Sequence, residues 1–256
     1  MTGERSIEVL FTPAEFETLS KRDLSETVCV VFDVLRATSS MVTALANGAE
    51  AIVPVSEIAE ALEIKRKVPQ ALLAGERDGL RIEANLTGSI GFDFGNSPRE
   101  FTRDRVAGKK IVMTTTNGTR ALRACAQAKT VLVSSFLNLQ STREYLQNQA
   151  SLRLVVVCSG TFEQTAFEDV LGAGALCLGL FGDVSYLDYS DSAGMAVNLY
   201  IDANRSLEAI MALSRNGRRL LSRPELKDDV AYCAQRDIYS FVAAMGKNGV
   251  VSRIGS

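Results

Sequence analysis

The 256-residue sequence contains no histidine. This absence excludes Ser-His-Asp triads, histidine-ligated metal sites and phosphohistidine chemistry. Any acid–base chemistry must therefore be performed by Asp, Glu, Lys, Cys or Tyr side chains.

The sequence also lacks a long apolar run and a large net charge. No run approaches the roughly 18 residues that indicate a membrane span. The N-terminal stretch MTGERSIEVL carries charges where a secretory signal needs apolar residues, so we expect a cytoplasmic protein. With a formal net charge of −2, overall electrostatics favour neither nucleic acid nor a membrane as a partner. The sequence leaves open whether the chain forms a homo-oligomer.

Several familiar motifs are absent too. None of the five cysteines is followed by an arginine six residues later, and no two of them form a CxxC pair, so we expect mostly small buried hydrophobic residues. Asp33 is followed by Val34 and Leu35, which excludes the D-x-D pair of phosphatases with an aspartyl nucleophile. No P-loop is present, and Gly172-Ala173-Gly174 is explained better by helix packing than by a dinucleotide loop.

The sequence does contain apolar, β-branched runs that alternate with segments of helical period. The runs that predict strands are Thr27–Phe32, Glu50–Val55, Ala71–Ala74, Lys110–Thr114, Val131–Ser134 and Leu152–Cys158. The segments that predict helices between them include Ser39–Asn47, Glu57–Lys67, Thr119–Ala128 and Gln140–Asn148. This alternation predicts α/β layers around a largely parallel sheet.

After Cys158 the pattern becomes helical. The candidate helices are Phe167–Phe181, Ser190–Tyr200, Ser206–Leu213 and Pro224–Met245. We expect one α/β domain over residues 1–256, either undivided or in two lobes with a helical part from about residue 160. Gly48 is expected just after a helix, and Ser97-Pro98-Arg99-Glu100 has the order of a capping Ser, an N1 Pro and an N3 Glu.

Four predicted strands are followed by a small polar loop and then a helix. These loops are Asp33–Ser40, Thr114–Arg120, Ser134–Thr142 and Cys158–Glu168. Ligands of parallel α/β sheets collect beyond the carboxyl ends of strands, so we expect the loops to converge on one crevice.

The first loop places an acid, an arginine and three hydroxyls between a strand and a helix. Asp33 is suited to hold a divalent cation. A phosphate could bind at the helix start, where Arg36 is followed by the hydroxyls of Thr38, Ser39 and Ser40. The alternative is that Asp33 and Ser39 are only turn and cap residues.

Two further motifs carry weaker signals. In Gly75-Glu76-Arg77-Asp78-Gly79, glycines flank three charges, and a surface turn is the simple explanation. The stretch Gly91–Pro98, which contains Asn96, reads either as a loop covering a site or as an ordinary buried loop.

The stretch TTTNGTRAL, residues 114–122, joins hydroxyls to an asparagine, a glycine and a cation at a helix start. Asn117, Gly118, Thr119 and Arg120 form a plausible oxyanion site, with a plain helix cap as the alternative. Farther along, Cys158-Ser159-Gly160-Thr161 precedes Glu168-Asp169. Those two acids are suited to reach a metal or merely to favour the helix dipole.

Taken in order, several motifs resemble the 2-phosphosulfolactate phosphatase family from about Val31 to Ala193. They are FDVLRATSSMVTALANGA, LLAGERDG, GFDFGNSPRE, TTTNGTRAL, CSGT with FEDVLGAGAL, and SDSA. The C-terminal stretch around Asp228-Asp229 is similar but less diagnostic. The resemblance implies a three-layer α/β/α fold and a Mg²⁺-dependent hydrolase that converts (R)-2-phospho-3-sulfolactate to sulfolactate and phosphate, a step toward coenzyme M in methanogens.

Within this resemblance we hypothesise that Mg²⁺ is held by a subset of Asp33, Glu76, Glu168 and Asp169, with water at the remaining positions. Arg36 with Thr38, Ser39 and Ser40 would bind the phosphoryl group. Asn117, Gly118, Thr119 and Arg120 would bind sulfonate or carboxylate, with Arg77 and Asn96 as further substrate ligands. Water is the first choice of nucleophile, Asp33 the second and Cys158 the last. Another small phosphorylated acid as substrate, or a polyanion-binding protein without activity, remain alternatives.

Overall fold

The computed structural model describes residues 5–149, 152–181 and 188–254. One eleven-stranded sheet runs through them. In spatial order its strands are β5 (Leu80–Arg81), β4 (Leu72–Arg77), β6 (Lys110–Thr114), β3 (Ala51–Val55), β11 (Val251–Ile254), β10 (Val242–Met245), β7 (Thr130–Ser134), β2 (Thr27–Phe32), β8 (Leu152–Cys158), β1 (Arg5–Leu10) and β9 (Asp188–Tyr189).

Two parallel blocks make up most of this sheet. Strands β4, β6 and β3 form one block, and β7, β2, β8, β1 and β9 form the other. The antiparallel hairpin β10–β11 joins them at the centre. The predicted α/β class with a largely parallel sheet is confirmed, whereas the division into domains stays a prediction.

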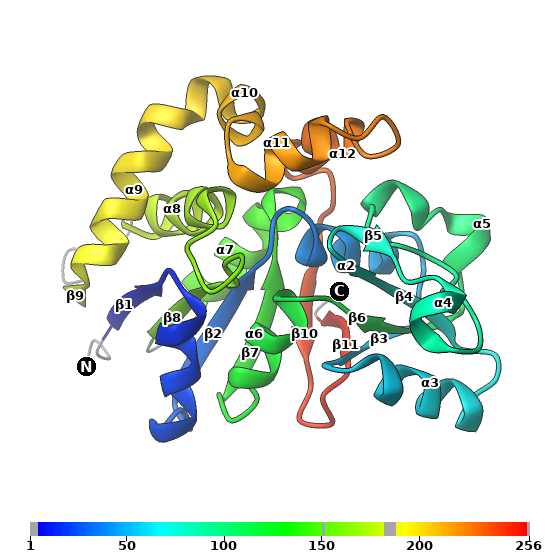
Figure 1. The fold of residues 1–256 in the computed structure, drawn as a ribbon. Helices are drawn as coiled ribbons and strands as arrows, with labels where there is room; N and C mark the ends of the chain where they lie inside the picture. The colour runs from blue at the N-terminus through cyan, green and yellow to red at the C-terminus, as the bar shows by residue number, and fades with distance from the viewer. Residues whose placement is uncertain (1–4, 150–151, 182–187, 255–256) are drawn as a thin grey trace.

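Helices cover both faces of the sheet (Figure 1). Those of the first half are α1 (Pro13–Phe16), α2 (Ala37–Ala46), α3 (Ile58–Lys67), α4 (Ala84–Thr87), α5 (Arg103–Val106), α6 (Gly118–Ala124) and α7 (Leu139–Gln147). Those of the second half are α8 (Phe167–Phe181), α9 (Asp191–Ala203), α10 (Leu207–Ala212), α11 (Arg215–Leu221) and α12 (Asp228–Cys233). Short 3₁₀ turns are η1 (Glu17–Lys21), η2 (Pro98–Glu100), η3 (Phe136–Asn138) and η4 (Asn204–Ser206).

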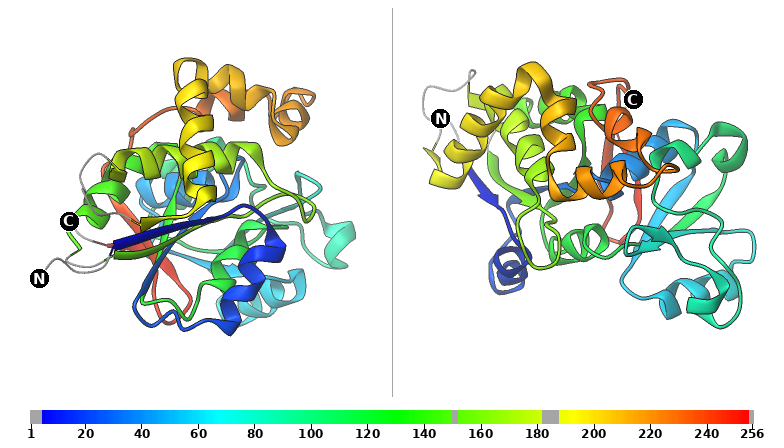
Figure 2. Two further views of the ribbon diagram at one scale, coloured as in Figure 1. Left: turned by 90° about the vertical axis from the view of Figure 1, so that its left-hand side faces the viewer. Right: turned by 45° about the horizontal axis from the view of Figure 1, so that its top comes forward.

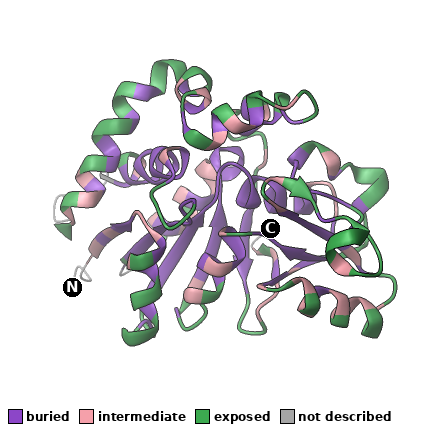
Figure 3. Cartoon of the chain, in the orientation of Figure 1, coloured by how far each residue is buried: buried purple, intermediate pink, exposed green. Residues whose placement is uncertain are grey.

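Alternate residues of the central strands supply two separate cores. Along β2, Val28 and Val30 pack with α7, α8 and α9, whereas Cys29 and Val31 pack with α2 and α6. This alternation follows from the two-residue period of a strand, and it explains why β2 is apolar from Val28 to Phe32. Figure 3 shows the strands buried while the outer helices keep exposed faces.

The helix α8 packs closely through its glycines. A Cβ on Gly172 would lie 2.7 Å from the Phe32 ring, and one on Gly174 would lie 2.1 Å from the carbonyl oxygen of Ala196 in α9. The packing explanation of the Gly172-Ala173-Gly174 run is confirmed. None of the described helices is long and apolar enough to cross a lipid bilayer.

The C-terminal helices lie beside the strand ends. Figure 1 shows α9 to α12 following one another along the upper edge of the molecule. In Figure 2 the same segment is coloured yellow to orange. The predicted helix Pro224–Met245 is wrong: only α12 is helical, and Val242–Met245 is the buried strand β10. A short apolar run has no period that separates strand from buried helix.

Of the two predicted helix-end signals, the one at Gly48 is confirmed and the capping role of Ser97 is wrong. Gly48 follows α2 with φ +92°, as a glycine after a helix does. Ser97 precedes Pro98 at the start of η2, but its hydroxyl does not cap that turn. It donates instead to Asp229 at 2.6 Å, which orients this side chain toward α12.

Candidate active site

A polar, partly open pocket lies beyond the carboxyl ends of β2, β4, β6 and β8. Its lining consists of Asp33, Leu35, Arg36, Glu76, Asp78, Gly79, Asn96, Thr115, Thr116, Asn117, Gly160, Thr161, Phe162, Asn216, Arg219 and Leu220. Three of the four predicted loops therefore converge on it. The loop Ser134–Thr142 contributes nothing to the lining, whereas α11 does.

Asp33 is fixed in the pocket wall by the starts of two helices. Its Oδ1 accepts a hydrogen bond of 2.9 Å from the N–H of Ala37 in α2. Gly118 begins α6 against the other oxygen, since a Cβ there would be 2.7 Å from Asp33 Oδ2 and 2.6 Å from Ala37 Cβ. Gly118 therefore permits a close approach that no other residue allows.

Burial raises the pKa of Asp33 above its ordinary value, and the charge of Glu76 raises it further against the opposing effects of the Ala37 N–H and Arg36. Burial also raises the pKa values of Glu168 and Asp169, with repulsion from Asp33 adding to both. The buried carboxyls Asp33, Glu168 and Asp169 are consequently harder to ionise than carboxyls in water.

Asp169 and Glu168 lie behind the pocket lining. Asp169 accepts hydrogen bonds from Val34 N at 2.8 Å, Ser159 Oγ at 3.0 Å and Gly160 N at 3.2 Å. Glu168 Oε1 accepts from Asn216 Nδ2 at 2.5 Å, while its buried Oε2 has no hydrogen-bond partner in the described structure. Asp169 therefore holds the loops that follow β2 and β8 together, whereas Glu168 anchors α11 through Asn216.

Glu76 lies in the lining with both oxygens engaged. Its Oε2 accepts a hydrogen bond from Gly79 N at 2.7 Å, and its Oε1 accepts from the N–H and the hydroxyl of Thr116, each at 2.9 Å. The loop Thr114–Arg120 thus already holds an anion, which is a carboxylate of the chain itself.

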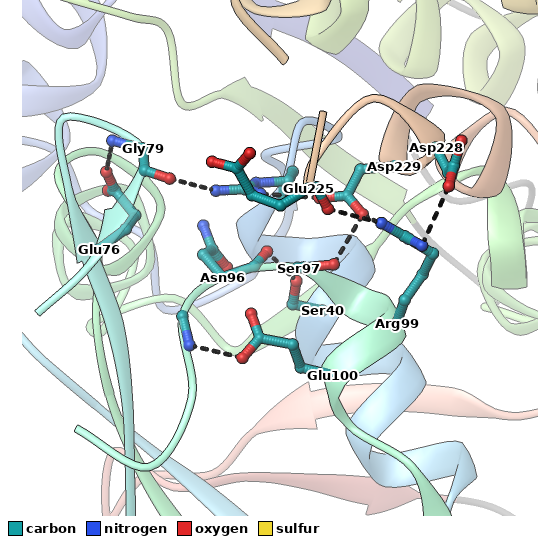
Figure 4. A network of polar contacts seen from close by, with 12 residues as sticks. Ser40, Glu76, Gly79, Asn96, Ser97, Arg99, Glu100, Glu225, Asp228 and Asp229 are labelled. Atoms are coloured by element: carbon teal, nitrogen blue, oxygen red, sulfur yellow. Dashed lines mark hydrogen bonds and ion pairs between the residues drawn. The ribbon is translucent and has the colours of Figure 1, made fainter. Parts of the chain in front are cut away.

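Arg36 is held in a buried network that the C-terminal helices complete. It is 3% exposed, and it donates to Asp229 Oδ2 at 2.7 Å and to the Gly79 carbonyl at 2.9 Å. Asp229 Oδ1 also accepts from Ser97 Oγ at 2.6 Å and Arg99 Nε at 2.9 Å, as Figure 4 shows for the labelled residues. The network joins the start of α2 to α12 and η2.

The three hydroxyls after Arg36 are buried and bonded to backbone carbonyls. Thr38, Ser39 and Ser40 donate to the carbonyls of Asp33, Val34 and Asn96 at 3.0, 2.8 and 2.7 Å, respectively. None of the three hydroxyl residues lines the pocket. Their contacts shape the loop around Asp33 and Arg36.

In the second loop only Asn117 of the four predicted ligands lines the pocket. Thr119 is buried, and its hydroxyl donates to the Thr115 carbonyl at 3.0 Å. The Arg120 guanidinium forms ion pairs with Glu17 and Glu163 away from the lining.

Of the three remaining candidates, one lines the pocket and two do not. Arg77 donates to the carbonyl of Glu76 at 2.7 Å and to Thr114 Oγ1 at 3.1 Å, and it does not line the pocket. Asn96 does, and its buried Oδ1 has no partner in the described structure. Cys158 packs in the apolar core beneath α8, where burial raises the pKa of its thiol well above the ordinary value.

The pocket offers few ligands for a metal ion. Within the described residues, no three or more His, Cys, Asp or Glu side chains are placed to hold one. Asp33 and Glu76 both line the pocket, however, and Mg²⁺ is often held by one or two carboxylates together with water and substrate phosphate. The residues present fit such a substrate-bridged ion and not a closed protein cage.

Sequence reasoning missed the residues that the C-terminal helices bring to the site. Asn216 and Arg219 reach the pocket from α11, and Asp229 holds Arg36 from α12. The only sequence signals are a run of polar residues, RNGRR, in an apolar helical stretch and the adjacent pair Asp228-Asp229. Neither has a spacing that indicates a site.

Comparison with known proteins shows the family of the chain. The family model described as 2-phosphosulpholactate phosphatase matches residues 14–248. The chain belongs to that family. It is similar to three proteins named probable 2-phosphosulfolactate phosphatase. That of Caldanaerobacter subterraneus is 37% identical over 94% of this chain and 97% of the relative. That of Pseudothermotoga lettingae is 39% identical over 92% and 94%, and that of Thermotoga maritima 38% over 86% and 89%.

Proposed function

We propose that the protein hydrolyses (R)-2-phospho-3-sulfolactate to sulfolactate and phosphate. The observation that supports this most is its similarity, over at least 86% of its length, to relatives that bear this name. The pocket beyond the strand ends is the place where such a substrate would bind, because it gathers two arginines, amide side chains and hydroxyls.

Charge explains why a divalent cation would be needed there. The substrate carries roughly four negative charges near neutral pH, and the charged lining comprises Asp33, Glu76 and Asp78 against Arg36 and Arg219. Two like charges 4 Å apart repel by about 4 kcal/mol at an effective dielectric constant of 20. An anionic substrate therefore requires additional positive charge.

Mg²⁺ would be held by Asp33 and Glu76, and when bound it would neutralise charge on the phosphoryl oxygens. Arg36 would bind the phosphoryl group through N–H donors not used by Asp229 and Gly79. Asp33 would take a proton from the attacking water, whose oxygen bonds to phosphorus as the P–O ester bond breaks. The leaving 2-oxygen would take up a proton from solvent in the open pocket. Asn117 and Asn96 would bind other substrate oxygens.

Water is preferred to a covalent nucleophile for a geometric reason. Cys158 is in the core and cannot approach a phosphorus atom in the pocket. Asp33 is the only competing candidate. Rapid acid quenching of the enzyme with ³²P-labelled substrate distinguishes them, because a stable label on Asp33 would exclude direct attack by water.

The test of the function is phosphate release from 2-phosphosulfolactate and from 2-phospholactate, each with Mg²⁺ and with EDTA. We expect release that depends on the metal and favours the sulfonate substrate. Equal rates for the two substrates would indicate a broader phosphatase for phosphorylated 2-hydroxy acids. No release from either would overturn the proposal and favour a polyanion-binding protein.

A further inference from the structure

Arg219 differs from Arg36, the other arginine of the pocket, in having no buried partner for its guanidinium. It extends from α11, its side chain is 30% exposed, and its guanidinium donates no hydrogen bond within the described structure. Its nearest charge is Asp78, with 3.6 Å between Arg219 Nη2 and Asp78 Oδ1. That distance is too long for a hydrogen bond, so the pair is held by charge alone.

Neutral neighbours fix the position of this guanidinium. It lies 5.7 Å from the centroid of the Phe162 ring. A Cβ on Gly79 would be 3.6 Å from Arg219 Cζ, which places the guanidinium directly over the turn between β4 and β5. A planar group with open N–H donors is therefore oriented at the pocket before any ligand binds, which reduces the entropic cost of binding.

Asp78 is a replaceable partner. It is 82% exposed and lies in the left-handed region, with φ +55°, at the tip of the turn. By contrast, Arg36 is bound to the fully buried Asp229. An incoming anion can displace Asp78 from Arg219 because that carboxylate is solvated on release, whereas displacing Asp229 would leave a buried charge unpaired.

We propose that Arg219 binds the sulfonate of the substrate and determines the preference for it, with Asp78 as the competing internal anion. This inference rests on the proposed function. In the substrate the sulfonate sulfur is four bonds from phosphorus, whereas the carboxylate carbon is three. When the phosphoryl group is bound by Arg36, the sulfonate is therefore the anionic group with the longest reach to a second arginine. Two oxygens of a sulfonate match the parallel N–H donors of a guanidinium.

The first test compares Arg219→Met with Arg218→Met on 2-phosphosulfolactate and 2-phospholactate. Arg218 is the matched control because it has the same charge on the same helix and bonds to the Leu213 carbonyl outside the pocket. We expect Arg219→Met to raise KM for the sulfonate substrate about tenfold to a hundredfold, and at least tenfold more than for 2-phospholactate. Arg218→Met should change neither.

In the second test we expect a variant with a lower KM than wild type. Asp78→Asn removes the competing charge, and asparagine tolerates the left-handed backbone. We expect KM for 2-phosphosulfolactate to fall about twofold to fivefold, with a smaller change for 2-phospholactate. A purely structural role of the ion pair predicts that KM rises instead.

Arg219→Lys keeps the charge but not the parallel donors, so its KM should lie between those of wild type and Arg219→Met.

The outcomes separate this inference from the proposed function. Turnover of both substrates with equal losses in Arg219→Met would overturn the sulfonate assignment and leave the phosphatase function intact. If wild type turns over neither substrate, calorimetric titration of sulfolactate and lactate into wild type and Arg219→Met still decides. Sulfolactate binding that is unchanged by Arg219→Met, or absent in wild type, would overturn the assignment.

Discussion

At the scale of single residues, the site depends on how tightly Asp33 is confined. The carboxylate is held by the Ala37 N–H on one side and by the Cα of Gly118 on the other. Burial raises the pKa of Asp33 although the Ala37 N–H opposes this effect. The confinement fixes the direction from which a substrate or cation can approach. Small changes in the surrounding atoms should consequently have large effects on turnover.

Gly118→Ala tests that confinement. The added methyl would lie 2.7 Å from Asp33 Oδ2, so the carboxylate must move, and a displacement of about 1 Å in an active site typically lowers the rate about a hundredfold. We expect kcat to fall by about that factor while circular dichroism is unchanged. Gly194→Ala in α9 is the control, since its Cβ meets nothing closer than 3.7 Å. Equal activity of both variants would contradict the account.

Cys158→Ala tests the exclusion of the thiol. Because Cys158 is buried in the core, we expect stability to fall by about 1 kcal/mol and kcat to stay within about twofold of wild type. Urea unfolding and steady-state kinetics measure the two effects. A folded variant that has lost turnover would restore Cys158 as a candidate nucleophile.

At the scale of secondary structure elements, α11 and α12 complete a site that the strand loops begin. Asp229 in α12 holds Arg36, whereas its neighbour Asp228 is exposed and pairs only with Arg99 at 3.3 Å. The two adjacent acids on one short helix therefore have different roles.

Asp229→Asn should be strongly destabilising, because Arg36 would remain buried without its counter-ion. Breaking a buried pair typically costs about 3–5 kcal/mol. Asp228→Asn should change the free energy of unfolding by less than about 0.5 kcal/mol. Urea denaturation of both variants provides the comparison, and equal effects would refute the assignment of distinct roles.

The sequence predicted the bounds of several elements and some of the residues that line the pocket. Strands β2, β6 and β8 and helix α8 have the predicted bounds, because each is a long apolar segment with a clear period. Residues Asp33, Arg36, Glu76, Asn96 and Asn117 line the pocket as adjacent strand ends suggested. Thr38, Ser39, Ser40 and Thr119 have buried contacts with the backbone instead. Their hydroxyls look alike in the sequence whether they face a ligand or a carbonyl.

The contributions of α11 and α12 were not predicted. Arg219 and Asp229 are more than 180 residues from Asp33, Arg219 belongs to no motif, and the stretch around Asp229 is only weakly diagnostic. Their roles arise from how the C-terminal helices pack against the strand ends. The strand β10 was missed because its four apolar residues are equally compatible with a buried helix.

At the scale of the whole molecule, the buried acids make stability depend on pH. The pKa values of Glu168 and Asp169 are raised in the folded state, so folding favours their protonated forms. This stabilising contribution is complete below their unfolded values, near 4, and is lost as pH rises through the folded values.

We therefore expect Tm in EDTA to fall as pH rises above about 5, past the unfolded pKa values of the two acids. Exposed carboxyls whose pKa values are lowered, such as Asp23 and Glu63, oppose this trend only at lower pH, nearer their own pKa values. Differential scanning fluorimetry at constant ionic strength measures the slope. A Tm that rises across this range would contradict the direction of the two pKa shifts.

The central claim is that Asp33 in this pocket supports hydrolysis of the phosphate ester. Its most direct test is the rate of phosphate release from 2-phosphosulfolactate, with Mg²⁺, by wild type and by Asp33→Asn. The account predicts that the variant folds, as judged by circular dichroism, and loses at least about a thousandfold in kcat/KM, since both the attacking water and the cation would lose a charged ligand. A folded Asp33→Asn enzyme within tenfold of wild type would contradict it.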